Sequence, residues 1–419
     1  MMFYKETNFK ETSVGEIPKE WRVVRLGDIT EIDKESKDRA RETPNETFTY
    51  IDIDSIEQGT GKIRHPKRIL GRNAPSRARR VIYENDVIMS TVRPYLKAFA
   101  MVTKEYDKQI CSTGFAVLSC RASILPYFLL SVLFSEAVIS QCNRMMMGGQ
   151  YPALNQSQVP QINIALPPLL EQQKIAEVLS TVDEAIQKTS EVIAKTERLK
   201  KGLMQKLLRK GIGHKEFKDT EVGKIPKEWE VVTVRDLGEV VTGTTPSTSV
   251  NDYWNGKYPF VTPTDFSGDR YVYATERTVT EKGLKKARAI PRDSVLVVCI
   301  GSTIGKVSLA FEECITNQQI NAILCKEGIN PQYVYYTMAL RKDLLRAQAG
   351  ITAKPIVKKS MFEKFHLPLP SPPEQKKIAE ILSTVDTKVE LERNEKARLE
   401  RIKQGMMGLL LTGQIRVMV

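Results

Sequence analysis

The sequence FKETSVGEIPKEW at residues 9–21 returns as FKDTEVGKIPKEW at 217–229, and EQQKIAEVLSTVD at 171–183 returns as EQKKIAEILSTVD at 374–386. A period of about 205 residues is much longer than the 20–50 residues of solenoid repeats. The repeat therefore predicts two copies of one unit, each made of a globular domain followed by a long helix. Two copies in one chain favour a partner with two similar halves.

The composition favours a globular protein that binds a polyanion. The 419 residues include 41% hydrophobic residues, enough for ordinary cores, and 63 Lys+Arg against 50 Asp+Glu give a net charge of +13. Such a charge suits nucleic acid, although plain solubility is also compatible with it. No apolar run approaches the roughly 20 residues that cross a bilayer. The N-terminal MMFYKETNFKET does not resemble a signal peptide. We expect a cytoplasmic protein without membrane contact.

The sequence offers little for catalysis. The six cysteines form no CxxC pair and the three histidines stand apart, so neither a zinc site nor a disulfide framework is indicated. The segment Gly301-Ser-Thr-Ile-Gly305-Lys306 resembles a P-loop but is one residue short, and Val307 follows it in place of the hydroxyl that would bind magnesium. No motif of an amino-methyltransferase is present either. We therefore predict a noncatalytic protein with no cofactor and no metal.

Two kinds of segment alternate along the chain. Residues 20–165 and 228–367 carry short β-type runs broken by Gly, Pro, Asn and Asp, with helical stretches near 126–140 and 331–348, which is typical of a mixed α/β domain. The segments between them are long charged helices. The predicted fold class is α+β (mixed), with domains at 1–165 and 211–367 and long-helix regions at 166–210 and 368–419.

The two long helices are predicted to pair. Apolar residues recur at steps of three and four from Ile175 to Leu203, and again from Ile378 to Leu409 with a polar middle. The helices have equal predicted lengths of about 57 Å, and Gly211 and Gly413 suit left-handed C-caps. We expect an antiparallel coiled coil with pseudo-two-fold symmetry. The alternative is that each helix packs only on its own domain.

The linker at 209–227 resembles the N-terminal residues 9–19. The entry into the first domain therefore looks like the entry into the second, as in a circular chain opened at residue 1. We expect both termini to lie near one end of the rod that the paired helices form.

The first domain contains a dense basic segment, followed by a short loop with an aromatic residue. In a loop, guanidinium groups can bind phosphates or the O6 and N7 atoms of guanine. A solvated basic face without a ligand is the alternative. The candidate DNA-binding residues are Arg64, Lys67, Arg68, Arg72, Arg77, Arg79, Arg80, Arg93, Tyr95 and Lys97.

The second domain has a different composition in the segment that corresponds to this basic segment. Small hydroxyl side chains and lysines suit phosphate contacts. Tyr253 and Trp254 fit base stacking or the core equally well. Gln318-Gln319 could read adenine, although a buried strand end is the favoured interpretation. The candidate residues are Thr244, Thr245, Ser247, Thr248, Tyr253, Lys285, Lys286, Arg288 and Lys306.

These segments together resemble the DNA specificity subunits of type I restriction-modification enzymes. The resemblance runs through TGTTPSTSVNDYWNGKYPFVTPTDF at 242–266, EKGLKKARAIPRDSVLVVCIGSTIGKVSLA at 281–310, TNQQINAIL at 316–324 and both EQxKIAExLSTVD helix starts. Their order and duplication make the resemblance specific. The first domain departs from the commoner pattern, because YIDIDSIEQGTGKI and APSRARR replace the segment with Tyr253 and Trp254.

The resemblance implies a noncatalytic subunit with two target recognition domains, each reading one half of a split site in double-stranded DNA. It also implies that the paired helices set the gap and dock two adenine-methyltransferase subunits, with restriction subunits as further partners. Because the two domains differ, we predict an asymmetric target. The alternatives are a nonspecific nucleic-acid-binding scaffold and the detached recognition part of a fused restriction-methylation enzyme.

Overall fold

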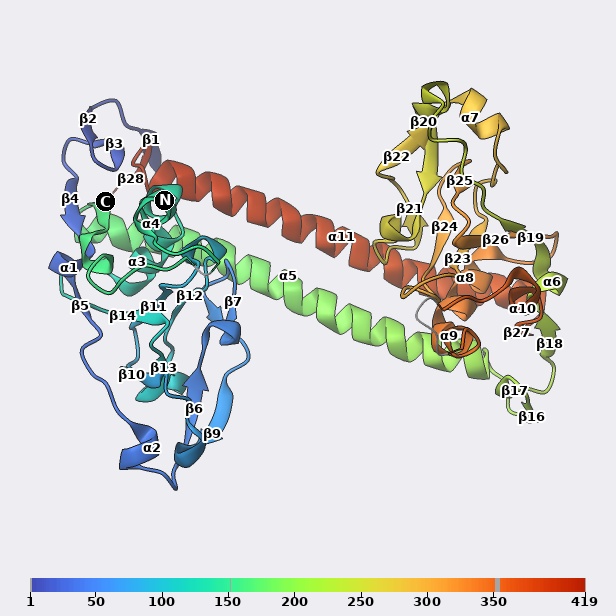
Figure 1. Ribbon diagram of the computed structural model, residues 1–419, viewed down its shortest axis with the longest axis horizontal. Coiled ribbons are helices and arrows are strands. Elements are labelled where there is room, and N and C mark those ends of the chain that lie inside the picture. Colours follow the sequence, from blue (N-terminus) through green and yellow to red (C-terminus); the bar gives the residue numbers. More distant parts are fainter. Residues whose placement is uncertain (1, 151, 351–354, 419) are drawn as a thin grey trace. The chain divides into compact units, whose positions relative to one another are not determined.

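The computed structural model describes residues 2–150, 152–350 and 355–418. Contacts divide the chain into two compact units, residues 1–188 with 396–419 and residues 189–395. The division falls within the two long helices, so each unit contains one globular domain and a part of each helix. Figure 1 labels the elements along the chain.

The first unit contains the first domain and the two chain ends. Its helices are α1 (Leu26–Ile29), α2 (Arg39–Glu42), α3 (Pro126–Leu133) and α4 (Glu136–Met145). Its strands are β1 (Phe3–Lys5), β2 (Phe9–Thr12), β3 (Gly15–Pro18), β4 (Arg22–Arg25), β5 (Thr30–Ile32), β6 (Thr47–Ile51), β7 (Ile56–Glu57), β8 (Lys62–Ile63), β9 (Lys67–Leu70), β10 (Ala78–Ile82), β11 (Val87–Ser90), β12 (Phe99–Met101), β13 (Gln109–Ser112), β14 (Phe115–Cys120), β15 (Asn163–Leu166) and β28 (Ile415–Val417).

Two four-stranded sheets organise this domain, in the orders β12-β11-β14-β5 and β10-β13-β6-β9. The first sheet packs against α3, whose buried face supplies Phe128, Leu129 and Leu133 to the main core. The β6–β9 pair and α2 lie at the end of the domain remote from the long helices (Figure 1). The mixed α/β prediction is confirmed for this copy.

The second unit repeats this plan with different strand lengths. Its helices are α6 (Val234–Leu237), α7 (Glu281–Lys285), α8 (Pro331–Leu340), α9 (Lys342–Ala347) and α10 (Lys359–Glu363). Its strands are β16 (Phe217–Thr220), β17 (Gly223–Pro226), β18 (Glu230–Thr233), β19 (Gly238–Thr242), β20 (Trp254–Val261), β21 (Tyr271–Val272), β22 (Arg277–Val279), β23 (Val295–Val298), β24 (Val307–Ala310), β25 (Ile315–Thr316), β26 (Ile320–Cys325) and β27 (His366–Leu369).

Strand pairing shows that the two domains are copies. β23 pairs with β24 and β26 as β11 pairs with β12 and β14, and β20 runs parallel to β25 as β6 runs parallel to β13. α8 covers the second sheet from the position that α3 has in the first domain. The predicted duplication therefore holds at the level of the hydrogen-bond ladders.

The long helices are α5 (Leu169–Lys210, 42 residues) and α11 (Pro372–Leu410, 39 residues). The two helices were predicted to have equal lengths, but they differ at their C-terminal ends. α5 runs up to the residue before Gly211, whereas α11 ends at Leu410, three residues before Gly413. Gly211 and Gly413 have φ angles of 64° and 72°, so both left-handed glycines are confirmed.

The two helices touch within each unit. In the first unit, Lys403 of α11 forms an ion pair with Asp183 of α5 at 2.6 Å. In the second unit, Lys200 of α5 pairs with Asp386 of α11. Apolar side chains of both helices also share the core of each unit. Within each unit, the parts of the two helices that belong to it are therefore in contact.

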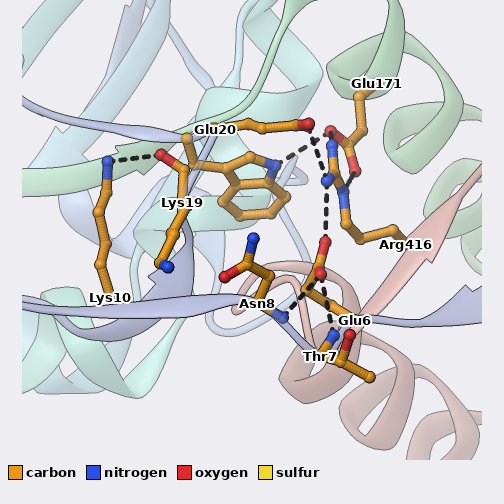
Figure 2. A network of polar contacts seen from close by, with 9 residues as sticks. Glu6, Thr7, Asn8, Lys10, Lys19, Glu20, Glu171 and Arg416 are labelled. Carbon is orange, nitrogen blue, oxygen red and sulfur yellow. Dashed lines mark hydrogen bonds and ion pairs between the residues drawn. The ribbon is translucent and has the colours of Figure 1, made fainter.

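A buried cluster of ion pairs joins the N-terminal and C-terminal segments in the first unit. β1 pairs with β28, which brings the two ends of the chain together as predicted. Arg416 of β28 bonds Glu171 of α5 through two nitrogens, each at 2.9 Å, and also contacts Glu6 and Glu20 (Figure 2). The Trp21 Nε1 donates to the same Glu171 carboxylate at 3.0 Å.

The second unit repeats the cluster with different partners. Trp229 Nε1 donates to Glu374 at 2.9 Å, and the Ile212 backbone N–H donates to the same carboxylate. His214 takes the place of Arg416, with its Nε2 3.0 Å from Glu374. The duplicated PKEW and EQxK motifs therefore recur because the tryptophan of one binds the glutamate of the other.

Among the described residues, no helix combines the length and the apolar character that a membrane span needs.

Candidate nucleic-acid interface

The basic segment of the first domain is divided by its structure into two groups. Four of its seven cationic side chains contact carboxylates from other segments, which the sequence pattern did not indicate. The pairs are Arg64–Glu57, Lys67–Asp52, Arg79–Asp38 and Arg80–Asp33. Asp52 raises the pKa of Lys67 through their hydrogen bond. These pairs neutralise part of the predicted positive patch.

Arg80 belongs to the interior. Its residue is only 4% exposed, and its guanidinium lies 2.7 Å from Asp33. Burial raises the pKa of Asp33, although Arg80 acts in the opposite direction. A side chain in this position holds β10 to the loop after β5 and cannot reach a phosphate without leaving the core, so we remove it from the candidate set.

Arg68, Arg72 and Arg77 form the second group. All three are exposed, and no ion pair joins them to a carboxylate within the part of the chain that the structure describes. Arg68 lies on the edge strand β9, Arg72 in the turn that follows it, and Arg77 directly before β10. As exposed cations with no carboxylate partner among the described residues, they are the side chains of this segment best placed to bind phosphate.

The Arg93–Lys97 loop joins β11 to β12 in an unusual conformation. Arg93 and Lys97 have φ angles of 48° and 54°, the left-handed region that costs a non-glycine residue roughly 1–2 kcal/mol. The Arg93 guanidinium donates to the Gln150 carbonyl at 2.9 Å, and Lys97 pairs with Glu136 at 3.1 Å. Tyr95, between them, is exposed.

The second domain has glycines at the corresponding positions. Gly301 and Gly305 follow β23 as Arg93 and Lys97 follow β11, and their φ angles are 95° and 88°. The segment that resembled a P-loop is therefore a strand-to-strand connection and not the start of a helix. Lys306 Nζ donates to the Phe266 carbonyl at 3.3 Å.

The hydroxyl-rich loop of the second domain follows β19. A Cβ on Gly243 would lie 2.2 Å from the Asn317 carbonyl oxygen, so the loop runs tightly against the turn before β26. Thr245 Oγ1 donates to the exposed Gln318 at 2.9 Å, and Arg288 donates to the Thr242 carbonyl at 2.9 Å. These contacts gather hydroxyl, amide and guanidinium groups into one polar surface.

Gln318 was given a strand-end role by the sequence, but its side chain is exposed at this surface. It was underestimated because only the three-dimensional packing of two loops brings it beside Thr245. An amide that faces solvent beside hydroxyl groups has the donor and acceptor pair that reads adenine.

The remaining candidates of the second domain have mixed environments. Thr244 is partly buried, Thr248 and Lys286 are exposed, and Ser247 shares a hydrogen bond with Ser249. Lys285 is paired with Glu281 at 2.6 Å.

The aromatic pair beside this loop has a structural role. Trp254 is only 8% exposed and donates to the Ser247 carbonyl, and Arg277 stacks on its ring at 3.8 Å. Tyr253 is partly buried against the same small core. Core packing is thus the better description of Trp254, while Tyr253 keeps a partly open edge.

A family model described as the type I restriction modification DNA specificity domain matches residues 18–198 and 226–401. The two matches cover both copies of the repeat. The chain belongs to this family. Its function is therefore that of a type I DNA specificity subunit, and a nonspecific scaffold is not favoured.

Curated relatives match along nearly the whole chain. The putative type I restriction enzyme MjaX specificity subunit of Methanocaldococcus jannaschii is 30% identical over 100% of this chain and 99% of its own length. The HindI specificity subunit of Haemophilus influenzae is 23% identical over 94% of this chain and 100% of its own length.

Solved structures match as well. A chain from a study of complex assembly and conformational transition of the type I R-M system has a TM-score of 0.58 and 26% identity, covering 95% of this chain and 99% of that one. A type I restriction-modification S subunit from M. genitalium has a TM-score of 0.61 at 14% identity, covering 93% and 96%, and supports the fold alone.

Proposed function

We propose that each globular domain of this specificity subunit reads one half of an asymmetric, two-part DNA target. The observation that carries the proposal is the contrast between the exposed polar groups of the two domains. The first offers unpaired guanidinium groups at Arg68, Arg72 and Arg77, and the second offers Thr245, Gln318 and other small polar groups. Different donor and acceptor sets select different bases. We keep 1–165 and 211–367 as the boundaries of the two recognition domains.

We propose that α5 and α11 pair as an antiparallel coiled coil that separates the half-sites. The contacts of Asp183 with Lys403 and of Asp386 with Lys200 support this arrangement. In each pair, a residue near the start of one helix meets a residue near the end of the other.

We further propose that these helices dock two methyltransferase subunits, with restriction subunits as additional partners, and that this subunit itself does no chemistry. Several apolar side chains on the helices are exposed in the isolated chain. They are Leu199, Leu391, Ile402 and Leu409. Exposed apolar residues on a rigid surface are typical of a protein interface.

Selection from a randomised duplex library tests the target. The purified protein is mixed with the library at two salt concentrations, with and without the methyltransferase encoded beside it, and retained DNA is sequenced. We expect two short, different motifs at a fixed separation. Identical inverted motifs would contradict asymmetry, and retention that collapses with salt without enrichment would contradict sequence reading.

A matched pair of substitutions tests the first surface. Arg72→Gln should weaken target binding and reduce the slope of log affinity against log salt by about 1, as loss of one phosphate contact does. Lys19→Gln removes the same charge from an exposed position on the turn between β3 and β4 and should leave the slope unchanged. Equal effects of both variants would show that only net charge matters.

Helix insertion tests the separation. One heptad added to both α5 and α11 keeps the seam in register and adds about 10 Å to each helix. We expect the gap between the motifs to lengthen by a few base pairs at 3.4 Å each, while both motifs stay the same. An unchanged gap would show that the helices do not determine the spacing.

A further inference from the structure

A cavity of about 350 Å³ lies in the first unit, where the domain meets the long helices. Its apolar wall includes Met101, Tyr106, Leu130, Phe134 and Met407. The polar rim consists of loop residues around β8 and of helix residues. This volume is within the usual range for small-molecule sites, which are mostly apolar with a few converging polar groups.

The second copy provides an internal comparison for this cavity. The Gln172 side chain accepts a hydrogen bond from the Leu125 N–H, and the Gln375 side chain accepts one from the Asn330 N–H. Each bond fixes the start of α3 or α8 against a long helix. Leu125 and Asn330 therefore occupy equivalent positions at the starts of α3 and α8. Counting five residues onward from each aligns Leu130 with Tyr335.

The same counting assigns Tyr336 to the position of Ser131. Strand register aligns a third pair. Gly61 bridges Ala100 of β12 in parallel, and β21 runs parallel to β24, with the Leu309 N–H bonded to the Arg270 carbonyl. Arg270 therefore occupies the position of Gly61.

In the second copy, three large side chains occupy the space that is open in the first copy. Tyr335 and Tyr336 are 4% and 0% exposed, and Tyr336 Oη donates to Asp386 of α11 at 2.6 Å. Arg270 stacks on Tyr271, with 5.3 Å from the guanidinium carbon to the ring centre. The first copy has leucine, serine and glycine at these places, and the cavity is the volume that these smaller residues leave.

A polar edge is present at the same place in both copies. Asp183 of α5 accepts a hydrogen bond from Tyr127 Oη and pairs with Lys403, as Asp386 is bonded to Tyr336 and Lys200. The filled site of the second copy thus shows what fits here, namely two aromatic rings packed edge to face, one of which is bonded through its hydroxyl to a helix carboxylate and lies near its lysine. In the first copy Tyr127 reaches Asp183 from the preceding turn of α3 and leaves the ring space empty.

The charges of the rim indicate which ring compounds would bind. Three basic side chains, Lys62, Arg64 and Lys403, and two carboxylates, Glu105 and Asp183, line the cavity. Lys403 pairs with Asp183, Arg64 pairs with Glu57, which is not part of the lining, and Lys62 donates a hydrogen bond to the neutral amide of Gln187. In the second copy the long helix carries Glu390 one turn beyond Asp386, whereas the first copy has Gln187 one turn beyond Asp183. Loss of one carboxylate shifts the balance of this edge toward binding an anion.

We propose that this cavity is a binding site for a small planar aromatic anion, that is, one or two fused rings carrying a carboxylate, sulfonate or phosphate. The rings would lie between Leu130, Phe134 and Met407, and the anionic group would face Lys62. All lining residues belong to the first unit. The site does not depend on how either domain reads DNA.

Ligand-observed NMR and calorimetry with the full chain test the site. The probes are 1-naphthoate and 1-naphthylmethylammonium, which share their rings and carry opposite charges. We expect naphthoate to bind with one-to-one stoichiometry and the ammonium compound at least about tenfold more weakly. No naphthoate binding, or a preference for the cation, would overturn the proposal.

Ser131→Tyr copies the residue of the second domain into the cavity and should abolish naphthoate binding. Thr384→Tyr adds the same ring at an exposed position of α11 in the second unit and should leave binding intact. Equal binding by both variants would overturn the assignment. The thermal midpoint of each variant reports whether it folds.

Lys62→Gln provides a second variant that leaves the ring space unchanged. It should weaken naphthoate binding several-fold and leave the affinity of the ammonium compound the same or higher. Equal weakening of both probes would contradict the role given to charge.

Discussion

Replacement of Arg416 by methionine should loosen the first unit more than any other single substitution in its end cluster. Glu171 is only 1% exposed, and its carboxylate accepts hydrogen bonds from Trp21 and from two nitrogens of Arg416 (Figure 2). Methionine keeps most of the length of the side chain but removes every donor. The substitution therefore leaves a buried carboxylate with the tryptophan N–H as its remaining partner from this set.

The expected cost follows from the burial of the pair. Removing one member of a buried ion pair costs about 3–5 kcal/mol, mainly because the other charge stays desolvated. Because about 1.4 kcal/mol corresponds to a factor of ten, the opening equilibrium of this region should rise by about 140- to 3,700-fold.

Native-state hydrogen exchange read by mass spectrometry measures this change locally. A chain with two units need not unfold in one step, so a single midpoint would mix their contributions. Peptides from β1, β28 and the first turns of α5 should lose protection in Arg416→Met, while peptides around Trp229 should not change.

Two controls separate charge from packing. Glu171→Gln combined with Arg416→Met removes both charges and should recover much of the protection. Glu20→Gln removes an Arg416 partner whose side chain is 71% exposed and should have little effect, as exposed pairs usually do. A change below tenfold in Arg416→Met, or an equal loss in the second unit, would refute the reasoning.

Three further predictions concern other parts of the chain. Gly243→Ala should destabilise the second unit by about 1–3 kcal/mol, seen as a lower thermal midpoint, because its Cβ would lie 2.2 Å from the Asn317 oxygen; an unchanged midpoint would show that the loop relaxes freely. Gln318→Ala should relax base preference in one selected half-site, at a cost of about 1–3 kcal/mol, and leave the other half unchanged. Arg416 lowers the pKa of Glu6 in the folded chain. This pair therefore stabilises the first unit above the unfolded pKa of roughly 4.3, and the stabilisation is lost as the pH falls through the lower folded pKa. The difference between the urea midpoints at pH 6 and pH 3 should be smaller in Glu6→Gln than in the natural chain.

The repeat made much of the fold predictable. Each motif that returned in sequence performs the same task twice, as when Trp21 and Trp229 bind Glu171 and Glu374. The sequence could not reveal why these motifs are coupled, since 150 residues separate Trp21 from Glu171 and only tertiary contact joins them. It did indicate that the chain ends approach one another, because the linker and the N-terminus are alike.

The candidate site was less predictable because charge alone does not report pairing. Seven cations within a short segment indicated one basic patch, yet carboxylates from two other segments neutralise Arg79, Arg80 and Lys67. Local composition describes neighbours along the chain, whereas a salt bridge depends on neighbours in space. The same limit applied to Gln318, whose exposure depends on how two loops pack.

The two copies differ at positions where a substitution costs the fold little stability. The loop after β11 holds Arg93 and Lys97 in left-handed conformations at about 1–2 kcal/mol each, although Gly301 and Gly305 show that glycine serves the same turn without strain. Retaining charged side chains at such positions suggests that their chemistry, more than the turn itself, is what this loop provides. The end clusters, in contrast, keep a tryptophan and a glutamate in both copies, because a buried carboxylate tolerates few substitutes. A frame held by such clusters allows each recognition surface to change its loops without loss of the fold, which is the property that a subunit reading two different half-sites requires.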